Sequence, residues 1–515
     1  MQTVSDGRRR GRHSSARHVA SRVEQRPWKI PENPFPPLAV VSADALEAIH
    51  AAALQVLEEI GLEVLDAEAR AILKAGGAEV EASGTRVRFP RELVEGCIGL
   101  APEQFTLHAR NPARNLPVGG RHMLFAMVSS APNCSGPDGE RRPGTRADFR
   151  RFVELGHVLN IIHLHGGYAV EPTDLHPKIR HLEALRDLAT LSDKVFHAYS
   201  LGRERVRDAL EIVRIARGVS RAQLEREPSL LTIINTSSPL RLDGPMAAGI
   251  IEMARAGQAV CVTPFTLAGA MAPVTVAGAV AQQHAEVLAG LVLCQLVRPG
   301  APFIYGAFTS NVDMKTGAPA FGTPEYMQST LLGGQLARRL RLPYRASNTN
   351  AANALDFQAA YESVFSLWAA TMAGTHLVKH AAGWMEGGLR ADLLKVVLDA
   401  ELLQWIAAFL EPLSTTPADL ALEAIREVGP GGHFFGTAHT QARYRDAFYK
   451  PLISDWRNFG AWLEAGAPTA VHHAARLLDH LFADYAPPPM DPAIREELNA
   501  FVDRRIREGG VPTDY

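Results

Sequence analysis

Eight short apolar runs recur between residues 122 and 382, and longer amphipathic segments such as "RVRDALEIVRIARG" separate almost all of them. The runs are 122–127, 161–166, 194–200, 230–236, 258–264, 301–307, 342–348 and 375–382. This alternation is typical of βα units around a parallel sheet. Eight such units in about 290 residues match the size of a (β/α)8 barrel, which we predict over residues 119–410. The alternative is an open doubly wound sheet, but no G-x-G-x-x-G follows the first run.

The segments on either side of the predicted barrel have a different character. Residues 1–35 are rich in arginine and poor in apolar residues, so we expect a disordered basic tail. Residues 36–118 predict an N-terminal α+β cap, in which Ser42 is the N-cap of the first helix and a glycine pair ends the second. Residues 411–515 predict a C-terminal helical appendage packed on the barrel.

Composition excludes several classes of function. A net charge of −2 argues against nucleic acid or an acidic membrane surface as the main partner. The longest apolar stretch, 276–297, is interrupted by Gln, His and Glu, so we expect no membrane span. The four cysteines include no C-x-x-C pair, which favours a reducing, cytoplasmic setting without disulfides or a thiolate zinc site.

Functional side chains of such barrels lie where the strands end. Here these positions hold mainly amides, hydroxyls and aromatic rings, with few acids. Three asparagines, Asn348, Asn350 and Asn353, mark the end of the seventh run. Aromatic faces suit a quaternary ammonium cation, to which cation–π attraction contributes up to about 2 kcal/mol when desolvated. The alternative for each aromatic residue is that it merely plugs the barrel mouth.

A histidine pair is the one metal-like signal in the sequence. His163 and His165 are two residues apart on a predicted strand and would face the same way, as in metal-dependent hydrolase barrels. The fourth, fifth and sixth runs end in "IINT", "VCVTP" and "IYGA" and supply no further ligand. We therefore favour a core or rim histidine pair and predict no metal site, with a hydrolase as the alternative function. A non-catalytic betaine-binding protein is a third possibility.

Several long motifs resemble one known family. The segments "FTSNVDMKTGAPAFGTPEYM", "LPYRASNTNAANALDFQAAYES", "HAAGWMEGGL" and "GPGGHFFGTAHT" together resemble the trimethylamine methyltransferase superfamily of corrinoid-dependent enzymes. The resemblance covers nearly the whole chain from about residue 40 and implies a (β/α)8 barrel that passes a methyl group to the cobalt of a corrinoid. Archaeal members carry pyrrolysine near the position of Asn350. An ordinary residue stands here, so the chain resembles the branch that acts on glycine betaine and related quaternary amines.

The strand-end positions and the resemblance together indicate a set of site residues. These are the expected catalytic residues Asn350 and Glu386, and the expected substrate-binding residues Asn348, Tyr305, Phe308, Phe265, His380, Trp384 and Asp313. The amides and His380 would hold a substrate carboxylate, the acids would balance the cation, and the aromatic rings would contact it. The chain lacks a D-x-H-x-x-G cobalamin motif, so a partner protein is expected to carry the corrinoid. We also expect a homo-oligomer.

Overall fold

A computed structural model describes residues 23–82, 84–136 and 139–512. Its centre is a closed barrel of eight parallel strands in the order β10-β11-β13-β15-β18-β19-β6-β9. The strands are β6 (Leu124–Met127), β9 (Leu164–His165), β10 (Val195–His197), β11 (Leu230–Ile234), β13 (Ala259–Val262), β15 (Phe303–Gly306), β18 (Tyr344–Ser347) and β19 (Leu377–Ala382). Each lies within a predicted run. The (β/α)8 prediction is confirmed, and the open-sheet alternative is wrong because β19 pairs with β6 and closes the ring.

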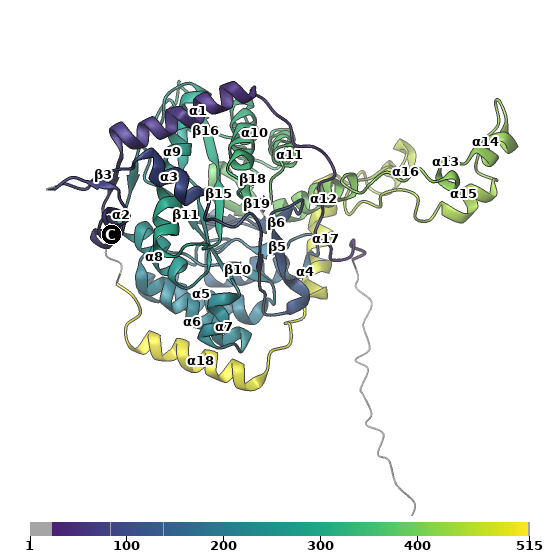
Figure 1. Cartoon of the computed structure of the whole chain (residues 1–515). Coiled ribbons are helices and arrows are strands. Elements are labelled where there is room, and N and C mark those ends of the chain that lie inside the picture. Colours follow the sequence, from purple (N-terminus) through teal and green to yellow (C-terminus); the bar gives the residue numbers. More distant parts are fainter. Residues whose placement is uncertain (1–22, 83, 137–138, 513–515) are drawn as a thin grey trace, which may run out of the picture.

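One long helix follows each barrel strand and covers its outer face (Figure 1). These helices are α4 (Arg146–Val158), α5 (Pro177–Leu191), α6 (Arg203–Arg217), α8 (Gly244–Arg255), α9 (Val276–Val297), α10 (Pro324–Arg339), α11 (Phe357–Met372) and α12 (Leu393–Phe409). A short helix, α7 (Arg221–Arg226), follows α6. Several begin at Thr or Asp side chains, which favour the N-cap position. For example, the Asp356 carboxylate accepts hydrogen bonds from the first turn of α11.

The amino-terminal end of the barrel is plugged. Alternate strand residues such as Leu231, Cys261 and Ile304 point inward and form one buried apolar cluster. The hairpin of β4 (Phe105–Leu107) and β5 (Leu116–Val118) adds side chains to this cluster. Since the hairpin also bonds to the chain just before β10 and β11, it closes this end. The carboxyl ends of the strands are therefore left to form the open end.

The N-terminal region contains the two helices expected from the sequence, with short strands between and after them. Its elements are α1 (Ala43–Gln55), a π turn (Val56–Ile60), β1 (Leu62–Val64), α2 (Ala67–Ala75), β2 (Glu79–Val80), β3 (Arg86–Arg88) and α3 (Arg91–Ile98). The Ser42 side chain caps α1 as predicted, accepting from the Ala45 amide at 3.3 Å. Strand β1 pairs with β3 and also with β12 (Arg241–Leu242), which belongs to the β11–α8 connection. The small sheet therefore joins the N-terminal region to the barrel.

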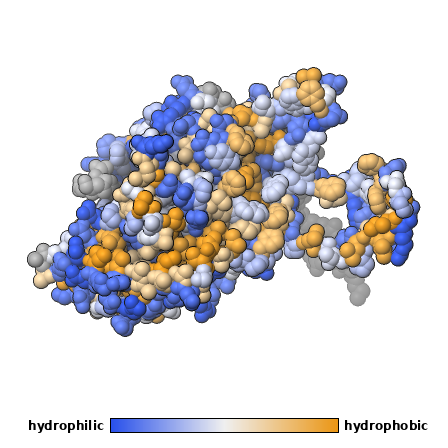
Figure 2. Space-filling model, turned by 90° about the horizontal axis from the view of Figure 1, so that it is seen from above, coloured by the Kyte–Doolittle hydropathy of each residue, from blue (hydrophilic) through white to orange (hydrophobic). Residues whose placement is uncertain are grey.

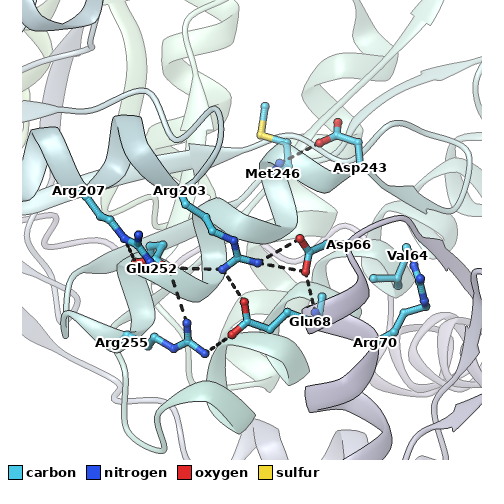
Figure 3. Close-up of polar contacts among 11 residues, drawn as sticks. Val64, Asp66, Glu68, Arg70, Arg203, Arg207, Asp243, Met246, Glu252 and Arg255 are labelled. Carbon is cyan, nitrogen blue, oxygen red and sulfur yellow. Dashed lines mark hydrogen bonds and ion pairs between the residues drawn. The ribbon is translucent and has the colours of Figure 1, made fainter. Parts of the chain in front are cut away.

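A network of ion pairs fixes α2 against α6 and α8 (Figure 3). The Arg203 guanidinium contacts Asp66 at 3.1 Å and Glu68 at 2.6 Å. Arg255 binds Glu68 as well, and Glu252 contacts Arg203. Because these charges share partners and are partly shielded, they position the region more firmly than isolated surface pairs would.

Two terminal segments differ from their predictions. Residues 1–22 of the predicted tail lie outside the described residues, but 23–35 pack on the barrel: the Trp28 ring lies 5.1 Å from that of His163. Apolar residues such as Val23 account for this, since they become buried. At the other end, α17 (Ala470–Asp484) and α18 (Pro492–Arg507) pack on barrel helices. The intervening α13 (Pro417–Leu420), α14 (Leu422–Val428), α15 (Ala438–Arg443) and α16 (Phe459–Glu464) instead project away from the barrel (Figure 1).

Helix α9 is the one helix in the described part of the chain that is long and apolar enough to cross a membrane. It is 78% buried in its most apolar window, packed between the barrel and α1, α2 and α3. Its polar residues Gln283, His284 and Glu286 are buried too. The composition of α9 is that of a core helix.

We expect Lys194→Met to destabilise the lower part of the barrel. The buried Lys194 ammonium donates to the carbonyl oxygens of Gly156, Leu159 and Ile162 at 2.7, 2.9 and 2.7 Å. Methionine would leave these acceptors unsatisfied, at a cost of about 2–3 kcal/mol. Thermal denaturation should show a lower Tm for this variant, whereas Lys178→Met at an exposed position should leave the Tm unchanged. Equal values for both variants would contradict a structural role for Lys194.

Candidate functional site

A pocket of about 320 Å³ lies at the open end of the barrel. Its floor consists of strand ends, and two small sheets formed by the connections after the strands build its walls. One sheet contains β14 (Phe265–Ala268), β16 (Phe308–Val312) and β17 (Pro319–Ala320). The other contains β7 (Asn133–Ser135), β8 (Arg142–Pro143), β20 (Trp384–Met385) and β21 (Arg390–Asp392). The volume is at the lower end of the range for small-molecule sites.

Aromatic rings line one side of the pocket. Phe265 and Phe308 pair in register at the starts of β14 and β16, and their rings stack at 5.3 Å. Trp384 meets Phe308 edge to face at 6.2 Å, and the His380 ring lies 5.6 Å from Trp384. Tyr199 enters from the end of β10. Electron-rich ring faces of this kind attract a cation even where no acidic side chain is present.

Two buried cations occupy the floor. Arg345 on β18 donates to the Ala307 carbonyl at 3.0 Å, and its guanidinium carbon lies 5.1 Å from the Phe308 ring centre. Lys379 on β19 donates to the Gly166 carbonyl at 2.8 Å. The buried Arg345 Nε has no hydrogen-bond partner among the described residues. No aspartate or glutamate of the described chain lines the pocket, so these two charges lack an acidic counterpart there.

A bulge in β19 directs two consecutive side chains into the pocket. The register of β19 against β6 shifts between Val378 and Ala382, and His380 has a positive φ of 53°. Such irregularities re-aim side chains at functional sites. Lys379 and His380 both line the pocket as a result. Burial, with Lys379 and Arg345 nearby, holds the pKa of His380 well below its usual range, so this imidazole is neutral.

Lys379 titrates near neutral pH. Burial, followed by the charge of Arg345, lowers the pKa of this ammonium to about 7. A bound anion would favour the charged form and raise the pKa again. A perturbed lysine in a cleft, next to a second cation, indicates an anion-binding function.

Four of the nine predicted site residues line this pocket: Phe265, Phe308, His380 and Trp384. Tyr305 does not, which corrects the prediction. Its neighbour Ile304 points into the barrel, so strand alternation turns Tyr305 outward, where its hydroxyl lies 3.0 Å from Nδ1 of His284. Asp313 lies in the turn between β16 and β17 and accepts from the Lys315 amide and the Thr316 hydroxyl. It is a loop-capping acid outside the pocket.

The asparagines and Glu386 also lie outside the pocket lining. The Asn350 amide donates to the Ala359 carbonyl at 2.8 Å and accepts from the Ala352 amide, so it ties the loop after β18 to α11. The Asn348 amide donates to the Ala381 carbonyl at 3.1 Å. Glu386 is held by two arginines, with oxygen–nitrogen distances of 2.8 Å to Arg141 and 3.1 Å to Arg390. Short polar side chains that follow a strand often satisfy the backbone of the next turn, as these asparagines do.

The two cations were not predicted from the sequence. A lone charged residue within an otherwise apolar strand was the available signal, in "LPYRAS" for Arg345 and "THLVKHAA" for Lys379. Such residues are rarely buried without a partner. His197 and Tyr199, which line the pocket from the end of β10, were not predicted either, and Asn235 after β11 lines it as well.

The histidine pair does not form a metal site in this structure. His163 and His165 flank the inward Leu164, so both rings face the helices and not the pocket. The Nδ1 of His163 accepts from the Phe125 amide at 2.9 Å, and its Nε2 lies 3.1 Å from the Lys29 carbonyl. No group of three or more potential metal-ligating side chains was found in the described part of the chain. The hydrolase alternative thus has no support from the geometry.

Two sequence comparisons with known proteins indicate one family. The family model of trimethylamine methyltransferase (MTTB) matches residues 8–510. A glycine betaine methyltransferase of Desulfitobacterium hafniense (strain Y51) is 35% identical over 477 residues, covering 92% of this chain and 99% of that protein. Trimethylamine methyltransferase MttB of D. hafniense (strain DSM 10664 / DCB-2) is 30% identical, covering 92% and 95%. Among solved structures, the hydroxylamine MtmB complex matches with a TM-score of 0.47 and 12% identity, covering 89% of this chain and 93% of that one.

We expect Asn350→Ala to lower stability and leave turnover unchanged. The substitution removes the bonds that join the loop to α11, at a cost of about 1–3 kcal/mol. Thermal denaturation should show a clear decrease in Tm, while kcat for methyl transfer stays within about twofold. Asn353→Ala is the matched control, because Asn353 is exposed in the same loop. A fall in kcat without a change in Tm would contradict this structural role and indicate that Asn350 acts in the active site.

Proposed function

The chain belongs to the trimethylamine methyltransferase family, and we propose that it is the methyltransferase for a betaine, a quaternary amine that also carries a carboxylate. The methyl acceptor would be cobalt(I) of a corrinoid held by a separate protein. The name of the relative that shares 35% identity, glycine betaine methyltransferase, supports this substrate class.

The two buried cations carry the proposal. A carboxylate between Arg345 and Lys379 would give each a charged partner, and the guanidinium fork matches the two carboxylate oxygens. The unpartnered Arg345 Nε is one donor for this contact. An amine without a carboxylate would bring a third positive charge close to two others. The floor of the pocket therefore favours betaines and disfavours simple methylamines.

The aromatic wall receives the other end of the substrate. Phe265, Phe308 and Trp384 lie on the walls above the strand ends, in the direction of the open mouth. A trimethylammonium group there gains cation–π and dispersion contacts and has its methyl groups toward the opening. One betaine molecule thus spans the pocket from the cationic floor to the aromatic wall.

Methyl transfer from a quaternary amine needs no acid from this chain. A corrinoid bound at the mouth would supply cobalt(I), a strong nucleophile, as the methyl acceptor. The quaternary nitrogen already bears its positive charge and leaves as a neutral tertiary amine, so no proton has to be added. Neutral His380 and the aromatic side chains then serve to orient the substrate and exclude water, and orientation alone can contribute several kcal/mol.

The corrinoid is carried to the site in our proposal. A pocket of about 320 Å³ suits a small amine, so the macrocycle would meet the substrate at the open mouth on its own carrier protein. We also place the protein in the cytoplasm, since all four cysteines are free thiols and buried.

We expect betaines to be the best methyl donors in a substrate screen. Glycine betaine, proline betaine, carnitine, choline and trimethylamine would each be incubated with cob(I)alamin, and its visible spectrum would report methyl transfer. Betaines should react fastest, choline slowly, and trimethylamine slowest because a tertiary amine must be protonated before it can leave. Faster turnover of trimethylamine than of every betaine would overturn the proposal. Betaine binding without transfer would indicate a binding protein.

Lys379→Met should weaken betaine binding by about 10- to 100-fold, because a charge-assisted hydrogen bond contributes about 1.5–3 kcal/mol. Calorimetry of glycine betaine binding measures this loss. Binding of choline, which has no carboxylate, should not weaken, and Lys315→Met in the exposed β16–β17 turn is the control variant.

The same lysine predicts a pH dependence. In the free enzyme the ammonium loses its proton as pH rises through about 7, so kcat/KM for betaine should fall above that pH. Lys379→Met should flatten this limb of the profile. A wild-type profile that is level between pH 6 and 9 would contradict the assignment of Lys379 to the carboxylate.

A further inference from the structure

Helices α11 and α12 present an apolar outer face to solvent. We call this face the flank and define it by its exposed residues: Phe357, Tyr361, Val364, Phe365 and Trp368 on α11, and Trp405 and Phe409 on α12. The rings of Trp368 and Phe409 lie 5.5 Å apart, so the two helices form one continuous surface. Phe357 is 82% exposed.

The pattern of α11 is the reverse of an ordinary surface helix. The exposed apolar residues recur at the spacing that usually faces a core. The side toward the barrel carries small and polar residues instead, such as Ala359, Ser363 and Ser366, all buried. Every charged residue of the two helices is also buried: Glu362, Lys395, Asp399 and Glu401. An exposed double-helix face with no charge is typical of an obligate protein interface.

The projecting segment also exposes large apolar side chains. We call residues 413–463, which contain α13 to α16, the arm. Only three of its residues, Ala424, Thr437 and Ile453, are fully buried, so it has no core of its own. Its large exposed residues include Leu413, Phe434, Phe435, Tyr444, Phe448, Trp456 and Phe459. Figure 2 shows apolar surface in orange on the arm, at the right of that view.

The arm is held at its base. Glu401 on α12 accepts hydrogen bonds from the backbone amides of Leu452 and Ile453 at 2.6 and 3.2 Å, and from the Ser454 hydroxyl at 3.1 Å. The arm begins four residues after Phe409, so its root adjoins the flank (Figure 1). It nevertheless extends away from the molecule and leaves the flank of its own chain open.

We propose that the arm of each chain covers the flank of a second copy, in a reciprocal dimer. Two unpartnered apolar surfaces on one side of the same chain satisfy each other when two copies meet about a twofold axis. If a fully exposed aromatic side chain offers about 200 Å², those of the arm and flank together offer on the order of 1,400 Å² per chain. Two chains would then cover up to about 2,800 Å², which is within the range of obligate dimers.

A second copy fits this surface better than the corrinoid carrier does. The carrier must reach the pocket mouth and leave again, whereas the flank runs down the side of the barrel. An uncharged aromatic surface also gives no electrostatic steering for a transient partner. The reciprocal dimer does not depend on which amine is the substrate.

Sedimentation analysis of the purified full-length chain at low micromolar concentration tests the proposal. We expect a dimer, or a larger assembly with an even number of copies. The flank variant Phe365→Asp/Trp405→Asp and the arm variant Phe448→Asp/Phe459→Asp should each sediment as monomers. Leu100→Asp, which alters an exposed leucine of the N-terminal region, should assemble like the wild type.

Mixing the two variants distinguishes the arm–flank contact from other arrangements. The heterodimer keeps one intact contact, between the native arm of the flank variant and the native flank of the arm variant, so an equimolar mixture should regain dimer. A mixture that stays monomeric would overturn the proposal, as would a monomeric wild type or a wild type that assembles only when the corrinoid carrier is added. Circular dichroism spectra matching the wild type would show that both variants are folded.

Discussion

Closure of the parallel barrel is the constraint on which the rest of this structure depends. Once β19 pairs with β6, every strand has two hydrogen-bonded neighbours, and all carboxyl ends meet at one rim. The β4–β5 hairpin fills the opposite end with apolar side chains. The connections that follow the strands therefore have a single place in which to build a site, and residues as distant in the chain as Phe265 and Trp384 become neighbours of one pocket.

The pocket floor runs against the ordinary rules of protein stability. Burial of a lysine and an arginine without an acid costs free energy, as the depressed pKa of Lys379 shows. The barrel retains them because its core, formed by the inward residues of eight strands, is large enough to tolerate a local cost. In our proposal the substrate carboxylate offsets that cost, so the same interaction would give affinity and select the substrate.

The outside of the barrel carries apolar surface that no part of its own chain covers. Most barrel helices bury their apolar side against the strands, but α11 turns its aromatic residues outward and small residues inward. The arm, which lacks a core, also leaves its apolar side chains exposed. Helices α17 and α18 show the contrasting case, because their buried leucines pack on the helices of their own barrel. The C-terminal region thus combines one part that completes its own chain with another whose apolar surface we assign to a second copy.

The sequence by itself determined the barrel. Strand and helix periodicity are local properties, so the eight strands, the capped helices and Ser42 could be located without tertiary information. Residues just after a strand end must lie at the rim, so Phe265, Phe308, His380 and Trp384, which line the pocket, could be assigned to that end from the sequence. Tertiary structure alone decided which way each strand residue points. A one-residue difference in strand phase turned Tyr305 outward and Arg345 inward, and a bulge brought Lys379 and His380 into the pocket together. Because phase and bulges are set by pairing with neighbouring strands, residues distant in the chain fixed them.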